Sequence, residues 1–278
     1  MNTAAFEGIS ARLKARSGLM LGPDKLYLLE TRLAPIMKRE GLRDLGALED
    51  AMRRGVPGLE AEVVEAMTTN ETLFFRDENP FTHLRQITLP RLHEARSPGT
   101  RLRIWSAAAS TGQEAYSIAI TLAEMPPGLG GRPAEIIGTD ISREALARAR
   151  AGLYTQFEVQ RGLSIQRLMK YFRKEADGWR VSEALRAMTE FRELNLLGDL
   201  RSLGTFDVVF CRNVLIYFDA PTKTRVLEAI ARQMAPDGVL YLGGAETVLG
   251  LTSALMPVPG ERGVYARAEG VEAMRRAG

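Results

Sequence analysis

The spacing of apolar residues changes character near residue 100. Before that point apolar positions recur every three or four residues, which predicts helices and no strands. One helix is expected to start at Gly22-Pro23, where a proline in the first turn costs no hydrogen bond, and to stop at Gly41. Pro35 is expected to kink or restart it. Further helices are expected over 44–54, from Leu59 onward and after Asn79-Pro80.

Beyond Arg101, short apolar runs alternate with stretches of helical spacing. Strands separated by single helices predict a mostly parallel, doubly wound, Rossmann-like sheet. The turn Pro236-Asp-Gly238 is expected to lead into one of these strands. The strands are expected over 102–105, 135–140, 205–211, 239–242 and 264–267.

The alternation is interrupted between Gly152 and Leu197. Two strands are expected here, Gly178–Val181 and Arg186–Leu194, and together they predict a small antiparallel β insertion at about 160–194. The expected organisation is a small all-helical N-terminal domain at 1–78, a linker helix at 79–100 and a sheet domain at 101–278.

Composition narrows the possible classes of protein. No apolar stretch approaches the roughly 18 residues of a membrane span, and the first residues lack the features of a signal peptide, so cytoplasmic residence is expected. The single cysteine, Cys211, excludes an internal disulfide and a cysteine metal cluster. With only two histidines, no metal site is expected.

The net charge of +3 is too small to argue for nucleic acid, but the charge is unevenly distributed. Between Ser10 and Arg43 there are eight basic and three acidic residues. A basic surface there would attract an acidic partner. The alternative interpretation is a solvated helix face.

Three polar groups of residues follow predicted strands. The first is the turn from Ser110 to Glu114, where Ser110 or Thr111 is expected to cap a helix and Gly112 to let a ligand lie against the backbone. The second is Asp140, which suits two ribose hydroxyls or, alternatively, caps a helix. The third is Cys211–Asp219, which forms an adenine pocket or a plain loop.

The missing motifs limit the ligand. The first turn has one glycine and no G-x-G-x-x-G, and the chain has no P-loop and no G-x-S-x-G. A nucleoside without phosphates fits better, and S-adenosylmethionine is a common one. The ammonium group of that cofactor would suit Glu114.

Three stretches resemble the CheR family of chemotaxis receptor methyltransferases: Asn70-Glu-Thr-Leu-Phe-Phe-Arg-Asp77, Ser106-Ala-Ala-Ala-Ser-Thr-Gly-Gln-Glu-Ala-Tyr-Ser117 and Phe210-Cys-Arg-Asn-Val-Leu-Ile-Tyr-Phe-Asp219. The resemblance spans nearly the whole chain. It implies a class I S-adenosylmethionine methyltransferase that methylates glutamate side chains of chemoreceptor signalling domains. Glutamate, with a pKa near 4.3, is already an anionic nucleophile at neutral pH, so no general base is required.

The resemblance also implies roles for residues. Arg76 and Tyr217 are implied at the reaction centre, with Arg76 holding the cofactor and Tyr217 near the methyl group. Glu114 would take the ammonium group of the cofactor and Asp140 its ribose hydroxyls. The full implied cofactor-binding set is Asn70, Thr72, Arg76, Glu114, Asp140, Asn195, Leu196, Arg212 and Asn213.

Substrate docking is expected on the basic N-terminal helices, through Arg32, Lys38 and Arg39. The chain departs from the common family pattern at Gln113, at Ala115 and in Gly243-Gly-Ala-Glu-Thr247. The turn at 173–178 is shorter than the glycine-rich loop of relatives that tether to a receptor pentapeptide, so the resemblance implies an enzyme without such a tether. A monomer is also expected. Two alternatives stay open, a methyltransferase of the same fold with another substrate and a cofactor-binding regulatory protein without turnover.

Overall fold

The chain folds into two compact units in a computed structural model that describes residues 3–97, 99–126 and 133–271. One unit comprises Met1–Thr69 with Tyr217–Lys223, and the other Asn70–Ile216 with Thr224–Gly278. No helix among the described residues is long and apolar enough to cross a membrane. The domain boundaries given above stay a prediction.

The N-terminal unit is helical, as its apolar spacing predicts. Leu29 and Leu33 of the second long helix are fully buried, with Leu48 and Val63 from its neighbours. A 3-10 turn begins at Pro23, where a helix was expected to start. The elements are α1 (Thr3–Ser17), η1 (Pro23–Lys25), α2 (Leu26–Arg39), α3 (Leu45–Arg53) and α4 (Leu59–Met67).

Pro35 does not restart its helix. It lies on an exposed position inside α2, which continues to Arg39. A proline this close to a helix end removes one backbone hydrogen bond, and its ring points to solvent, so the cost is tolerated.

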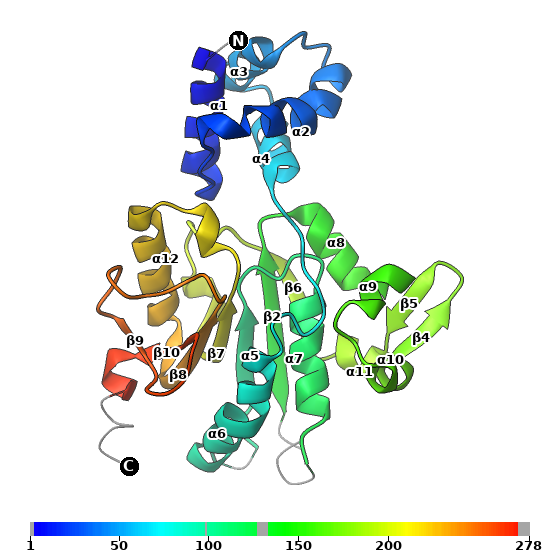
Figure 1. The fold of residues 1–278 in the computed structure, drawn as a ribbon, viewed down its shortest axis with the longest axis vertical. Helices are drawn as coiled ribbons and strands as arrows, with labels where there is room; N and C mark the ends of the chain where they lie inside the picture. Colours follow the sequence, from blue (N-terminus) through cyan, green and yellow to red (C-terminus); the bar gives the residue numbers. More distant parts are fainter. Residues whose placement is uncertain (1–2, 98, 127–132, 272–278) are drawn as a thin grey trace. The chain divides into compact units, whose positions relative to one another are not determined.

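The second unit is built on a seven-stranded sheet with the order β6-β2-β1-β7-β8-β10-β9 (Figure 1). The first five strands in this order are parallel, and β10 runs antiparallel to both neighbours. This confirms the mostly parallel, doubly wound prediction. The strands are β1 (Leu102–Ser106), β2 (Ala134–Asp140), β6 (Thr189–Glu193), β7 (Phe206–Cys211), β8 (Met234–Leu242), β9 (Leu255–Pro257) and β10 (Val264–Arg267).

Helices and short segments precede and connect these strands, although the stretch Tyr217–Lys223 among them belongs to the N-terminal unit. The central strands β1 and β7 are buried almost throughout, because parallel strands are covered on both faces. The elements are α5 (Asn79–His83), the π-helical segment η2 (Leu84–Thr88), α6 (Leu89–Ala95), α7 (Gln113–Ala123), α8 (Arg143–Ala151), α9 (Gln156–Gln160), α10 (Ile165–Tyr171), α11 (Glu183–Arg186), η3 (Arg201–Leu203), η4 (Leu215–Tyr217) and α12 (Ala220–Arg232).

The β insertion is present, but its strands differ from those expected. It is a three-stranded antiparallel sheet of β3 (Leu153–Tyr154), β5 (Gly178–Val181) and β4 (Phe172–Glu175), beside the main sheet with α9 to α11 (Figure 1). The strand predicted over 186–194 is β6, which pairs parallel with β2 in the main sheet, so its assignment to the insertion was wrong. Local sequence predicts a strand but not the partner with which it pairs.

A second strand also differs from expectation. Pro236-Asp-Gly238 lies inside β8, where the register against β7 shifts, rather than in a turn before the strand. The irregularity accommodates Pro236, which cannot donate a ladder hydrogen bond.

The turn from β1 into α7 is closed by Gly112, at φ +97° and in the N-cap position. A Cβ on this glycine would lie 2.9 Å from Ala149 Cβ and 3.0 Å from Tyr154 Oη. On the side where a Cβ would stand, Gly112 therefore packs against α8, and this contact by itself requires glycine. Neither Ser110 nor Thr111 caps the helix, because the Thr111 hydroxyl donates to Gln113 Oε1 instead.

Two glycine substitutions test this packing. Gly112→Ala should destabilise the second unit by about 3 kcal/mol, because left-handed strain adds to overpacking. Gly260→Ala, also at positive φ (+80°) but in open space, should cost only about 1 kcal/mol. Denaturant unfolding followed by tryptophan fluorescence reports on this unit, since both tryptophans, Trp105 and Trp179, lie in it. Equal losses would contradict the packing role.

Candidate functional site

The predicted cofactor residues gather along one edge of the main sheet. The chain leaves β1 towards β2 and β6, whereas β7 leads to β8 on the other side, so the winding reverses between β1 and β7. Ligands of open α/β sheets bind beyond the carboxyl ends of the strands at such a point. The carboxyl ends carry, in spatial order, Asn195 and Leu196 after β6, Asp140 at the end of β2, Glu114 after β1, and Arg212 and Asn213 after β7.

Glu114 and Arg212 form a buried ion pair at this reversal. Arg212 Nη1 lies 3.0 Å from Glu114 Oε2, and the two side chains are only 2% and 10% exposed. The Ser106 hydroxyl donates to Glu114 Oε1 at 2.8 Å. Burial raises the pKa of the Glu114 carboxyl above its ordinary value, while Arg212 and Ser106 act in the opposite direction.

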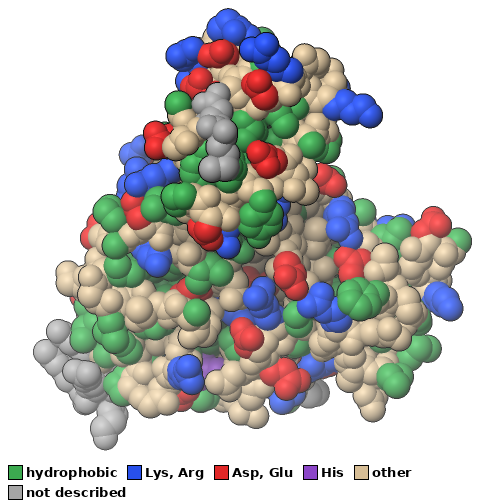
Figure 2. Space-filling model, turned by 45° about the horizontal axis from the view of Figure 1, so that its top comes forward, with side chains coloured by type: hydrophobic (Ala, Val, Ile, Leu, Met, Phe, Trp, Pro, Cys, Tyr) green, Lys and Arg blue, Asp and Glu red, His purple; other side chains and the backbone are tan. Residues whose placement is uncertain are grey.

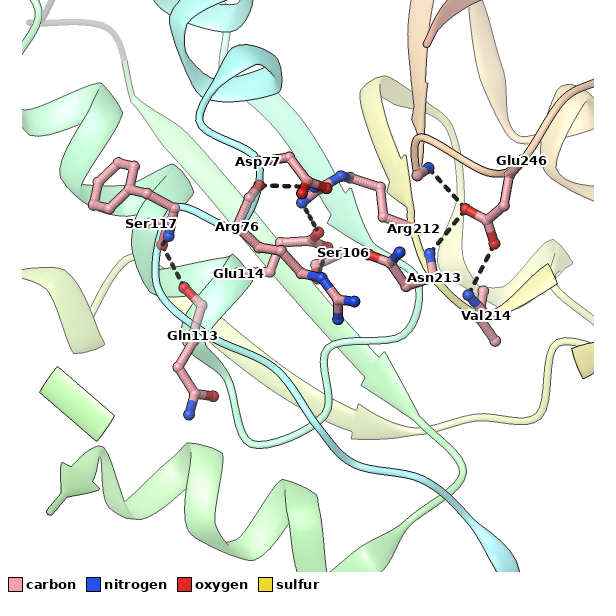
Figure 3. Close-up of polar contacts among 12 residues, drawn as sticks. Arg76, Asp77, Ser106, Gln113, Glu114, Ser117, Arg212, Asn213, Val214 and Glu246 are labelled. Carbon is pink, nitrogen blue, oxygen red and sulfur yellow. Dashed lines mark hydrogen bonds and ion pairs between the residues drawn. The ribbon is translucent and has the colours of Figure 1, made fainter. Parts of the chain in front are cut away.

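The same arginine holds the 70–78 segment, which precedes α5. Arg212 Nη2 donates to the Arg76 carbonyl oxygen and to Asp77 Oδ2, both at 2.7 Å (Figure 3). The Arg76 side chain extends from this segment across the site, and its Nη1 donates to the Glu71 carbonyl at 3.3 Å. Arg212 thus links the segment to the carboxylate on α7.

The 70–78 segment adopts a strained backbone. Phe75, Asp77 and Glu78 have φ angles of +50°, +66° and +39°, which residues other than glycine rarely adopt. The Ser117 hydroxyl on α7 accepts the Phe75 N–H at 2.9 Å and donates to the Gln113 carbonyl at 2.6 Å. Strain of this kind persists where surrounding contacts fix it, and it is found mainly at functional sites.

The beginning of the segment is held by the loops after β1 and β2. Ser110 Oγ donates to the Asn70 carbonyl oxygen at 2.7 Å, and Asn70 Nδ2 donates to Ser142 Oγ at 3.3 Å. Thr72 is half-buried in the same segment. Asn70 therefore lies against the loops that carry Ser110 and Ser142.

Asp140 joins these two loops. Its Oδ2 accepts the Ser110 N–H at 2.8 Å, and its Oδ1 accepts the Ser142 N–H at 2.9 Å. Ser142, not Asp140, caps α8, since its hydroxyl oxygen accepts the Ala145 N–H at 3.0 Å. The helix-cap interpretation of Asp140 was therefore wrong. A carboxylate oxygen can accept more than one hydrogen bond, so this side chain suits ligand hydroxyls.

Asn195 and Leu196 follow β6 at the same edge. Asn195 Oδ1 accepts the Leu197 N–H at 2.9 Å, and Leu196 is buried. The preceding Leu194 N–H donates to the Asp140 carbonyl at 2.9 Å, which links this turn to the end of β2. Tyr217, by contrast, belongs to the N-terminal unit, where its carbonyl accepts the Met20 N–H at 2.9 Å.

The three predicted docking residues differ in their surroundings. Arg32 Nη1 donates to the carbonyl oxygens of Met67 and Thr68 at the end of α4, at 2.9 and 3.0 Å. Arg39 pairs with Glu40 and Glu62, whereas Lys38 is exposed. On the face drawn in Figure 2, the basic side chains of the N-terminal unit are interspersed with acidic ones.

Sequence reasoning missed four residues of the site. Asp77, Ser106 and Ser117 stand within the quoted motifs, but only the fold shows their partners. Glu246 was read only as part of a departure from the family pattern, although a carboxylate four residues after the end of a buried strand, in a loop that begins with two glycines, was a usable signal.

The site chemistry fits a nucleoside with charged groups. Glu114 is a buried carboxylate that pairs with the cationic Arg212, and Asp140 is a second carboxylate, which suits hydroxyls. The buried Nε of Arg212 has no hydrogen-bond partner among the described residues, which leaves this donor for an anionic group. Among the described residues there is no group of three or more His, Cys, Asp or Glu that could hold a metal ion. The Rossmann-like fold and the groups at this edge fit the class of S-adenosylmethionine-dependent methyltransferases.

Comparison with known proteins identifies the family. Residues 4–68 match the all-alpha domain of CheR methyltransferases, and residues 70–264 match their S-adenosylmethionine-binding domain. Chemotaxis protein methyltransferase 1 of Pseudomonas aeruginosa is 44% identical over 270 residues, covering 96% of this chain and 98% of the relative. Chemotaxis protein methyltransferase Cher2 of Pseudomonas putida is 42% identical, covering 95% and 98%. The chain belongs to the CheR methyltransferase family, whose members act in chemotaxis, and its cofactor is S-adenosylmethionine.

The raised pKa of Glu114 predicts a pH-dependent effect of Glu114→Gln. Below the pKa of the unfolded state, near 4.3, Glu114 is neutral in both states; as pH rises through the higher folded pKa, the folded state must carry a buried charge. The free energy of unfolding of the wild type, minus that of the variant, should therefore increase from pH 8 to pH 4.

Denaturant titrations of both proteins across this range measure the difference. Because all other titrating groups are shared, their contributions largely cancel. A difference that is constant, or that falls towards low pH, would show that the Glu114 pKa is not raised.

Proposed function

We propose that this protein transfers the methyl group of S-adenosylmethionine to glutamate side chains in the signalling domains of chemoreceptors, forming glutamyl methyl esters. The observation that carries the proposal is the ordered edge from Asn195 through Asp140 and Glu114 to Arg212, closed by the 70–78 segment. This edge fits an extended nucleoside with a cationic amino-acid end, and family membership supports a receptor substrate.

The reaction needs little acid–base chemistry. When bound, the cofactor supplies an electrophilic methyl group on a sulfonium. The substrate carboxylate oxygen would bond to that methyl carbon as the carbon–sulfur bond breaks and leaves its electron pair on sulfur, so the reaction would require no proton transfer. The tasks of the protein are alignment of the reacting atoms and exclusion of water.

The residues of the edge would divide the binding task. Glu114, held by Arg212 and Ser106, would take the ammonium group, and Asp140 the ribose hydroxyls. Asn195 and Leu196 would frame the adenine. Asn70, Thr72 and Asn213 complete the proposed set of binding residues.

Arg76 and Tyr217 are proposed for the reaction centre. Arg76 would bind the cofactor rather than the substrate, because an arginine paired with the substrate carboxylate would stabilise the nucleophile and slow its attack. The carbonyl of Glu71, which accepts from Arg76, keeps this guanidinium close to its own segment. Tyr217 is proposed near the methyl group from the family resemblance.

The test combines catalysis with cofactor binding. Incubation with methyl-labelled cofactor and receptor signalling fragments should give label that base releases as volatile methanol. Glu114→Ala should weaken cofactor binding by about 10- to 100-fold, because a charged hydrogen-bond acceptor is lost. The control Glu183→Ala removes an exposed glutamate in the first turn of α11 and should change binding little.

Two results would contradict the proposal. Label on RNA or on a small molecule would favour another methyltransferase, and cofactor binding without labelled product would favour a regulatory protein. If Glu114→Ala lost fold and binding together, the assigned role of Glu114 would be wrong.

Receptor docking is proposed on the N-terminal helices, at Arg32, Lys38 and Arg39. Lys38 and the neighbouring Arg43 are exposed, so they offer a cationic contact for acidic receptor helices. The hairpin between β4 and β5 closes with only Ala176 and Asp177 between its paired ends, which supports an enzyme that works without a pentapeptide tether.

Charge reversal tests docking without harming the fold. Arg32 is unsuitable because it holds carbonyl groups at the end of α4. Lys38→Glu with Arg43→Glu should raise the KM for receptor fragments lacking the pentapeptide by about tenfold at low salt, and less at high salt. Cofactor affinity should not change. The control is a charge reversal at the exposed Arg225. If this control raised the KM as much as the double variant does, net charge alone would explain the effect.

A further inference from the structure

Glu246 lies in the loop that follows β8, and its carboxylate is surrounded by backbone N–H groups. Oε1 accepts from Val214 N at 3.0 Å and from Leu215 N at 2.7 Å. Oε2 accepts from Asn213 N at 2.8 Å and from Gly243 N at 2.7 Å (Figure 3). The residue is 8% exposed.

Burying a carboxylate is costly unless its oxygens are hydrogen-bonded. Here each oxygen accepts two N–H groups, and three of the four donors come from consecutive residues of the loop after β7. No ion pair to Glu246 is found within the described part of the chain. Backbone amides alone therefore hold this anion, in the manner of an anion-binding nest.

The arrangement joins the loops after two neighbouring strands. β7 and β8 pair in parallel up to Cys211 and Leu242, and the residues that Glu246 binds begin two positions after Cys211 and one after Leu242. Asn213 has a φ of +58°, a conformation that asparagine tolerates better than most residues. A Cβ on Gly243 would lie 2.7 Å from Glu246 Oε2 and 2.9 Å from Asn213 Nδ2.

We propose that Glu246 is a positioning residue for methyl transfer, acting through the loop after β7, which it holds so that Asn213 and its neighbour Arg212 keep their binding geometry. This inference rests on the proposed cofactor site. Glu246 itself need not touch the cofactor. It fixes the peptide groups of Asn213, Val214 and Leu215, directly between Arg212 and the residues that lead to Tyr217 in the sequence.

Glu246→Gln is the direct test. The glutamine oxygen can still accept two N–H groups, but its amide nitrogen faces the other two donors and forces the loop to shift. Because a lost hydrogen bond to a charged group weakens binding by about one to two orders of magnitude, the Kd for S-adenosylhomocysteine should rise about 10- to 100-fold. Amide hydrogen exchange should accelerate at Asn213, Val214, Leu215 and Gly243. A merely structural role would lower the melting temperature but leave Kd unchanged at temperatures where the variant is folded.

A matched glycine pair tests the same loop without altering the carboxylate. Gly243→Ala places a methyl group against Glu246 and Asn213, whereas Gly244→Ala meets nothing within 4 Å and has no positive φ. Gly243→Ala should weaken cofactor binding, and Gly244→Ala should bind as the wild type does. Thr247→Ala, which removes only the acceptor for the Leu249 N–H in the same loop, is a second control.

Different results would contradict the proposed function and the positioning role of Glu246. If the wild type neither binds the cofactor nor methylates receptor fragments, the proposed function fails. If it does both, and folded Glu246→Gln and Gly243→Ala bind with unchanged Kd, the positioning role is wrong. If Glu246→Gln does not fold, the comparison of Gly243→Ala with Gly244→Ala decides the question.

Discussion

The buried ion pair between Glu114 and Arg212 is the constraint on which the site depends. It joins the helix after β1 to the loop after β7, at the place where the sheet reverses its winding. Two buried charges are costly unless both are paired and further hydrogen-bonded. Arg212 meets this condition by also binding Asp77 and the Arg76 carbonyl, so the pair brings the 70–78 segment to the sheet.

Unusual backbone conformations gather around this pair. Ser110 and Asn213 have positive φ angles, as do Phe75, Asp77 and Glu78. In these strained stretches a side chain accepts a hydrogen bond from a backbone N–H group. Ser117 accepts from Phe75, Asp140 from Ser110 and Glu246 from Asn213. The site therefore consists of loops whose shapes are fixed by buried polar groups, and alignment is what the proposed methyl transfer, in which no proton moves, requires.

The sequence alone determined the fold class and the position of the site. Alternating short apolar runs and helical spacing gave the parallel sheet, because such strands must be buried on both faces. Polar residues placed directly after strands then had to meet at one edge, which put Asp140, Glu114 and Arg212 near one another. The absence of a phosphate-binding loop motif made a nucleotide ligand less favourable than a nucleoside without phosphates.

Pairing partners were decided only by the tertiary structure, because they involve residues far apart in the chain. Nothing local distinguishes β6 as a parallel strand of the main sheet, shows Gly112 packed on Ala149, or reveals that Arg32 holds the end of α4. Glu246 is the clearest case. Its four donors lie on two loops that come together only when β7 pairs with β8, so its role exists only in the folded chain.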